Sequence, residues 1–307
     1  LATMTINNSE NKISGSSKSS TQNEFGHLVK LAAPVALSQL ANMTMQVVDT
    51  YFVGKLGPIP IGGVAAGNSV FATFIVMGIG LLVGLDFLVS KAFGAKEIEK
   101  CHKYLVTASY LATLIAIPFV VILYCMSGTF AAFGINQAVV ENAQEYLYWI
   151  TPSLWPVLLF MAFRQYLQAM GVAAPTLWIM IIANILNAFG NYAFVFGNFG
   201  MPQMGIAGSG FATTLSRAFT FFAIAGYALL RDHRLKLGLL QTKWKFQVED
   251  AKRLLHLGGP AGAQMLLEVG VFALATLLAG RLDPVSLASH QIVLQIASTT
   301  FMVSMGL

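Results

Sequence analysis

Two acidic residues lie inside long apolar stretches of this sequence, where an ionisable side chain is costly. Asp49 lies late in the first stretch, with Asn42 and Gln46 earlier on the same helical face. Glu268 lies in the middle of a later stretch, one helical turn after Gln264. A carboxylate within a bilayer is stabilised when a cation or a proton binds it. Both acids are therefore predicted to bind a sodium ion or a proton inside a cavity.

Each acid also has a structural interpretation. Asp49 could be exposed at the outer membrane interface and pair with Lys55, and Glu268 could be a buried, protonated acid that holds helices together. We favour ion or proton binding for both acids, because an ionisable group within a bilayer usually marks the path of an ion or a substrate.

Asparagines form a third polar group, in a stretch near the middle of the chain. Asn187 and Asn191 are four residues apart and share a helical face. Amide oxygens can ligate a hard cation, although Asn side chains in membranes also commonly join helices by hydrogen bonds. The other amides on these faces are predicted to line a substrate cavity: Asn42, Gln46, Asn184 and Gln264.

Three further side chains in the apolar stretches have open interpretations. Tyr146 could stack on an aromatic substrate or belong to the aromatic belt of the membrane interface. Thr213 could join helices through its hydroxyl group. Arg217 follows one turn later, and the sequence assigns it no role.

The elements that carry these residues are predicted to be membrane-spanning helices. Hydrophobic residues make up 56% of the chain and charged residues 10%, far below the roughly 25% of a soluble domain. The apolar stretches are long enough to cross a bilayer and lack the alternation of a membrane β-barrel. The fold class is therefore all-α, a polytopic membrane bundle, with eight helices near residues 28–54, 61–85, 104–126, 140–163, 175–197, 207–230, 254–280 and 287–307.

Basic residues indicate how these helices are oriented. Lys and Arg gather at 91–103 and 231–253, and none occurs at 127–136 or 198–204. By the positive-inside rule the N-terminus is cytoplasmic, and the protein is predicted to lie in the inner or plasma membrane. Because the basic residues occupy alternate loops, the net charge of +5 does not indicate nucleic-acid binding.

The sequence repeats itself at an offset of 226 residues. Gly54-Lys55-Leu56-Gly57-Pro58 matches Gly280-Arg281-Leu282-Asp283-Pro284, and Pro34 matches Pro260. The repeat predicts a parallel arrangement of six-helix lobes, with the second lobe cut short after its second helix. The predicted domains are a disordered cytoplasmic tail, an N-lobe of six helices, a cytoplasmic linker and the start of a C-lobe, at 1–27, 28–230, 231–253 and 254–307.

Several motifs together resemble the multidrug and toxic compound extrusion (MATE) family. Val48-Asp49-Thr50 followed by Val53-Gly54-Lys55-Leu56-Gly57 is similar to its first helix, and Lys91-Ala92-Phe93-Gly94-Ala95 to the motif after its second. Arg164 to Gly171 and Asn191 to Gly197 resemble later segments, of the NorM type. Ala288-Ser289-His290-Gln291 resembles the start of the second lobe. The individual motifs are loose, and their order and spacing make the resemblance specific.

The resemblance implies an antiporter that exchanges sodium or protons for mostly cationic, amphipathic organic compounds. It implies a cation and proton site at Asp49, Asn187 and Asn191, with Tyr146 and Thr213 as polar neighbours and Glu268 as the acid of the C-lobe. Sodium at Asp49 or Glu268 is the one metal it suggests. We expect a monomer in the lipid bilayer, without another cofactor.

The predicted mechanism is alternating access, with Asp49 and Glu268 inside one central cavity between two rocking lobes. A flippase for lipid-linked precursors is the first alternative, although a phosphate ligand would require more Lys and Arg than this cavity offers. A receptor or scaffold without transport is the second. An enzyme is not predicted, since the five histidines are scattered and no phosphate-binding loop occurs.

Overall fold

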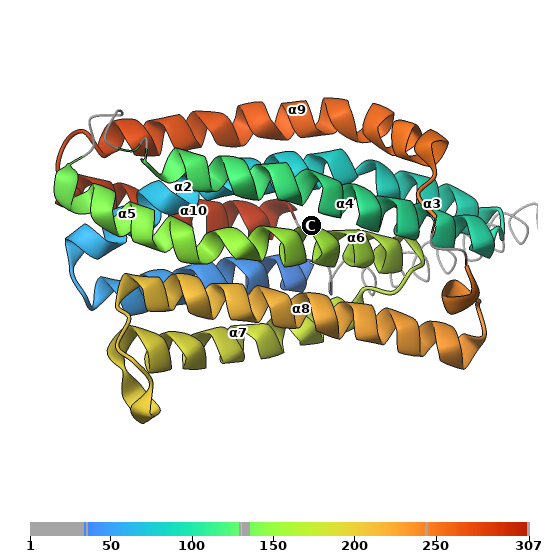
Figure 1. The fold of residues 1–307 in the computed structure, drawn as a ribbon, viewed down its shortest axis with the longest axis horizontal. Helices are drawn as coiled ribbons and strands as arrows, with labels where there is room; N and C mark the ends of the chain where they lie inside the picture. The colour runs from blue at the N-terminus through green and yellow to red at the C-terminus, as the bar shows by residue number, and fades with distance from the viewer. Residues whose placement is uncertain (1–33, 35, 129, 131–135, 243–244, 306–307) are drawn as a thin grey trace, which may run out of the picture.

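The computed structural model describes residues 34, 36–128, 130, 136–242 and 245–305. The predicted tail, residues 1–27, lies outside this range, as do the first residues of the first predicted helix. The described chain is a bundle of helices that run side by side along the long axis of the molecule (Figure 1). The first covers residues 36–54.

The remaining helices follow in the predicted order. They are α2 (Pro58–Leu82), α3 (Gly84–Gly94), α4 (Ile98–Met126), α5 (Gln137–Ile150), α6 (Leu154–Ala169), α7 (Ala174–Phe196), α8 (Ile206–Leu235), α9 (Val248–Ala279) and α10 (Pro284–Met305). Short 3-10 turns lie at Thr151–Ser153, Asn198–Gly200 and Leu239–Gln241. The all-α fold class is confirmed.

Six of the described segments are long and apolar enough to cross a membrane. They are Pro58–Gly94, Ile98–Met126, Gln137–Ala169, Ala174–Phe196, Ile206–Leu235 and Val248–Ala279. The helix at 36–54 and α10 are not among them, and both carry several amide and hydroxyl side chains. Some of these side chains line a shared pocket, described below: Asn42, Gln46 and Thr50 of the first helix, and Gln291 and Gln295 of α10.

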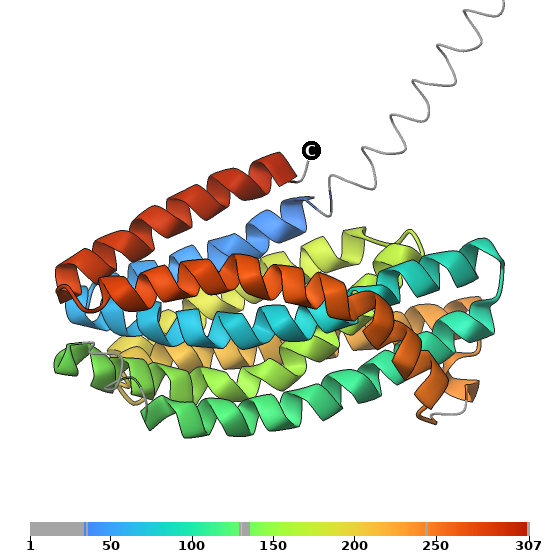
Figure 2. The same cartoon turned by 90° about the horizontal axis from the view of Figure 1, so that it is seen from above.

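Two of the predicted spans are divided into successive helices. Pro152 lies in the 3-10 turn between α5 and α6, where the hydroxyl groups of Thr151 and Ser153 donate to the carbonyl oxygens of Leu147 and Ile150, each at 2.6 Å. Because Pro152 has no N–H, it cannot donate to the carbonyl oxygens of Tyr148 and Trp149 in the preceding turn. These oxygens accept instead from the hydroxyl groups of Tyr124, at 3.5 Å, and Thr214, at 2.7 Å. Proline also lies within α9, at Pro260, and α9 is visibly bent (Figure 2).

Glycines allow α9 to cross α2 and α3 with backbone in contact. A Cβ atom added to Gly80 would lie 2.2 Å from the Cα atom of Gly262, and one added to Gly258 would lie 2.3 Å from the carbonyl oxygen of Leu81. Gly84 faces the same crossing, against the carbonyl oxygen of Leu254. The pairs with small-xxx-small spacing, Gly80/Gly84 and Gly258/Gly262, therefore pack against each other, as expected for close helix contacts in membranes.

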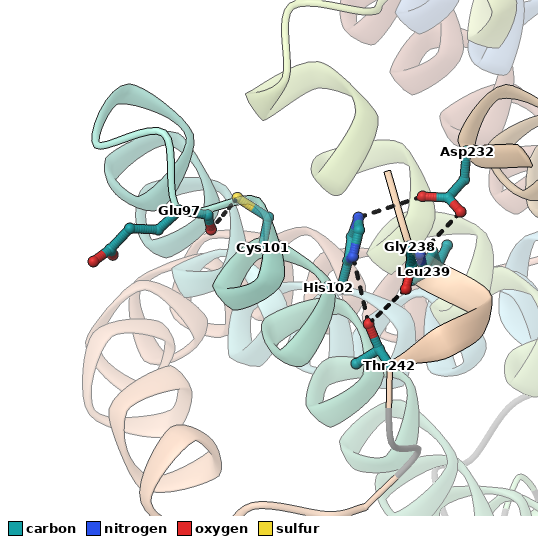
Figure 3. A network of polar contacts seen from close by, with 7 residues as sticks. All are labelled: Glu97, Cys101, His102, Asp232, Gly238, Leu239 and Thr242. Atoms are coloured by element: carbon teal, nitrogen blue, oxygen red, sulfur yellow. Dashed lines mark hydrogen bonds and ion pairs between the residues drawn. The ribbon is translucent and has the colours of Figure 1, made fainter. Parts of the chain in front are cut away.

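A buried polar cluster fixes the segment between α8 and α9 to the bundle (Figure 3). The Asp232 carboxylate, at the end of α8, accepts a hydrogen bond from the Leu239 backbone N–H at 2.9 Å and lies 3.5 Å from Nε2 of His102 on α4. Nδ1 of His102 lies 3.4 Å from the Thr242 hydroxyl group. The first part of the predicted linker thus packs on α4 and α8.

Candidate functional site

Asp49 is buried among three helices, with 4% of its surface exposed. Its carboxylate accepts hydrogen bonds from two side chains that lie far away in the sequence. Nδ2 of Asn191 on α7 donates to Oδ1 at 2.7 Å, and the Thr213 hydroxyl group on α8 donates to Oδ2 at 2.8 Å. Among the described residues no cation forms an ion pair with it. The two described groups that donate hydrogen bonds to the carboxylate are uncharged.

Asn187 completes the network from one turn earlier on α7. Its Nδ2 donates to the Thr213 hydroxyl oxygen at 3.3 Å, and its Oδ1 accepts from Asn191 at 3.2 Å. Asn187 and Asn191 are fully buried. Because each donor is itself positioned by a neighbour, the carboxylate is preorganised. The structure therefore brings together three of the four residues predicted to bind a cation or proton.

A pocket opens beside this carboxylate. Four side chains predicted to surround a substrate or an ion line it together with Asp49: Asn42, Gln46, Tyr146 and Thr213. They come from the first helix, α5 and α8. The cavity has a volume of about 20 Å³, which suits a water molecule or a bare ion rather than a whole drug.

Five polar lining residues have no role assigned from the sequence: Thr50 on the first helix, Asn68 on α2, Arg217 on α8, and Gln291 and Gln295 on α10. The Gln295 side-chain amide donates to the Thr50 hydroxyl oxygen and to the carbonyl oxygen of Gln46, the latter at 3.3 Å. These bonds join α10 to the first helix. The spacing of Gln291 and Gln295, four residues apart on one face, is the signal that could have found them.

Glu268 and Gln264 lie elsewhere. Both are exposed on α9, and neither lines the pocket around Asp49. The reason is the orientation of α9, which turns Gly258 and Gly262 toward α2 and so directs the opposite face away from the first helix. Contrary to the prediction, the two acids do not share a cavity in this structure.

Asn184 also lies outside the pocket lining. Its Nδ2 donates to the carbonyl oxygens of Ala41 and Met180, each at 2.8 Å. The first of these bonds ties α7 to the first helix. Asn184 therefore joins two helices by a hydrogen bond, which is the structural alternative given for these asparagines, and it does not line the pocket.

The oxygen atoms around Asp49 are suitable for binding a small hard cation or a proton. Oδ1 of Asn191 is buried and has no hydrogen-bond partner among the described residues, and it lies beside a carboxylate and the Asn187 amide. Carboxylate and amide oxygens are ligands for such ions. Among the described residues, no group of three or more His, Cys, Asp or Glu side chains is placed to hold a metal ion.

Comparison with known proteins agrees with this architecture. The chain is 32% identical over 294 residues to the probable multidrug resistance protein NorM of Bradyrhizobium diazoefficiens, covering 96% of this chain and 63% of that protein. It is 30% identical to the multidrug resistance protein NorM of Photobacterium profundum, covering 92% of this chain and 62% of that one. The chain thus spans less than two thirds of these relatives.

Solved structures show the same fold. The eukaryotic MATE transporter AtDTX14 superposes with a TM-score of 0.79 at 20% identity, covering 92% of this chain and 62% of that one. An outward-facing multidrug resistance MATE transporter superposes with a TM-score of 0.77 at 21% identity, covering 91% and 61%. The MatE family model matches residues 34–193 and 260–307. With six described segments long and apolar enough to cross a membrane, this chain is an integral membrane protein and a member of the MatE family.

Proposed function

We propose that the whole protein exports small, mostly cationic amphipathic compounds in exchange for sodium or protons by alternating access. The observation that carries this proposal is the Asp49 carboxylate, which is buried and hydrogen-bonded but has no ion-pair partner among the described residues. A multidrug efflux role is supported by the relatives' names.

The physical basis is the cost of an uncompensated charge in a low-dielectric interior. An ion or a proton that binds Asp49 removes this cost, and so does a cationic compound that displaces it. Transport requires that the ion bind the two conformations of the protein with different affinities. Asn191 and Thr213 come from α7 and α8, so any movement of these helices relative to the first helix changes the carboxylate's surroundings.

Glu268 is proposed to act as a separate acid in the C-lobe. It is exposed on α9 and forms no ion pair among the described residues, and the remainder of the second lobe would supply its surroundings.

The proposed lobes are residues 28–230 and 254–307. The N-terminus is proposed to be cytoplasmic and the protein to be a monomer. A flippase is less favoured, since Arg217 is the one basic residue in the pocket lining.

The test is transport by the whole protein in proteoliposomes. Ethidium should accumulate against its gradient when either a sodium or a proton gradient is imposed, and collapse of that gradient should stop it. Glu268→Gln is expected to reduce the initial rate about tenfold, since an intramembrane acid that binds an ion loses its charge. Binding of ethidium without gradient-driven flux would instead support a receptor or scaffold.

A further inference from the structure

The segment that joins α8 to α9 is fastened to the helices before it over its first half, Lys236–Thr242, here called the strap. The chain turns back where α8 ends, because Lys236 and Gly238 have positive φ angles of 52° and 93°. The Leu239 side chain, 1% exposed, then belongs to the hydrophobic core of the bundle. The strap therefore lies on the preceding helices and does not lead directly to α9.

Asp232, in the last turn of α8, is the centre of this fastening. Its Oδ2 accepts a hydrogen bond from the Leu239 backbone N–H at 2.9 Å, and its Oδ1 lies 3.5 Å from Nε2 of His102 on α4. Both side chains are buried. Among the described residues no Lys or Arg forms an ion pair with Asp232. One buried carboxylate thus joins the strap, α8 and α4.

His102 also contacts the far end of the strap (Figure 3). Its Nδ1 lies 3.4 Å from the Thr242 hydroxyl oxygen, and that hydroxyl group donates to the carbonyl oxygen of Gly238 at 3.1 Å. A buried polar group is costly without its partner, so loss of any one of these side chains weakens the hold of the others. The imidazole ring therefore secures both ends of the strap.

Fastening the strap shortens the part of the chain that connects the two proposed lobes. Five residues separate Thr242 from Val248, the first residue of α9, and they span at most about 20 Å when extended. With the strap released, the twelve residues between Leu235 and Val248 would span at most about 45 Å. The strap thus reduces the reach of this connection by about half.

We propose that Asp232, His102 and Thr242 form a latch that limits how far the two lobes separate at the proposed cytoplasmic end. This inference rests on the proposed alternating access and assigns it a regulating contact away from the ion site. The effective concentration of one tethered end near another falls roughly as the −3/2 power of tether length. Release of the latch is therefore expected to raise the ratio of separated to closed states about threefold.

Distances between the lobes test this proposal. Spin labels are placed at two exposed positions, Ala95→Cys between α3 and α4 and His256→Cys on α9, in a background without other exposed cysteines that includes Cys125→Ser. Double electron–electron resonance gives the distance distribution in the purified whole protein. Asp232→Ala should raise the ratio of long to short distances about threefold, and Thr242→Val, which removes only the hydroxyl group, should raise it less.

Two further variants separate the latch from a general disturbance of the fold. His233→Ala changes an exposed neighbour of Asp232 that is not part of the latch, and it should leave the distances unchanged. Seven Gly and Ser residues inserted between Lys245 and Phe246 lengthen the tether while the latch stays intact. This insertion should raise the ratio as Asp232→Ala does.

The outcomes distinguish the latch from the proposed function. If the wild type shows both distances, an unchanged ratio in the latch variants or in the insertion overturns the latch and leaves the proposed function standing. If Asp232→Ala does not fold, Thr242→Val and the insertion decide in the same way. A wild type with one distance at every sodium concentration and pH would contradict alternating access and the latch together.

Discussion

Replacing Asp49 with asparagine is expected to reduce ion-driven export of ethidium at least about a hundredfold. The variant keeps the shape of the side chain but removes the charge that a cation or proton would bind. It also converts charge-assisted hydrogen bonds from Asn191 and Thr213, worth about 1.5–3 kcal/mol each, into neutral ones. The measurement is the initial rate of efflux in proteoliposomes, normalised to the amount of folded protein.

The matched control for this variant is Glu141→Gln. Glu141 is an exposed acid on α5, outside the pocket, so its loss should leave efflux within about twofold of the wild type, as for most surface substitutions. The thermal midpoint of Asp49→Asn should remain near that of the wild type, since relief of the desolvation cost of a buried charge offsets the weaker hydrogen bonds. The midpoint of Glu141→Gln should not change, because this side chain is exposed. An Asp49→Asn protein that transports at the wild-type rate would refute the role assigned to this carboxylate.

Alanine at Gly80 or Gly258 is expected to disrupt the crossing of α9 with α2 and α3. The added Cβ would lie 2.2 Å or 2.3 Å from backbone atoms of the other helix, and backbone cannot move aside as a flexible side chain can. Overpacking of this kind costs about 1–3 kcal/mol or more. We expect a lower thermal midpoint for both variants and little or no transport.

The same crossing predicts a graded series along α9. A Cβ on Gly262 would meet its nearest atom at 3.3 Å, so Gly262→Ala should be milder than Gly258→Ala. Gly270 has nothing within 4 Å of the added atom, so Gly270→Ala should be neutral or slightly stabilising, because alanine favours the helix. If Gly270→Ala lowered the thermal midpoint as much as Gly258→Ala, the contact would not be the cause.

Local sequence patterns predicted the helices and one face of the site. Long apolar stretches indicate contact with lipid, which does not depend on the details of packing, and six of the eight predicted spans coincide with described segments long and apolar enough to cross a membrane. The face that holds Asn42, Gln46 and Asp49 follows from helical spacing alone. The glycine pairs predicted close packing, although the sequence did not say that they pack against each other.

The features of the site that could not be predicted depend on contacts between residues that lie far apart in the sequence. Arg217 donates to Ser153 and lies over the ring of Phe71, and no local sequence pattern shows that these residues come together. Gln295 donates a hydrogen bond to Thr50, which lies 245 residues earlier in the sequence. The position of Glu268 depends on which face of α9 meets α2, and its spacing from Gly262 places it off that face.

The central claim is that a cation and the substrate compete for Asp49, and a titration of ethidium binding tests it most directly. The affinity of the purified whole protein for ethidium is measured at rising sodium concentration and at several pH values. The account predicts that either sodium or protons weaken wild-type binding at least about tenfold, and that Asp49→Asn removes this dependence. An equal dependence on the ion in wild type and Asp49→Asn would contradict the account.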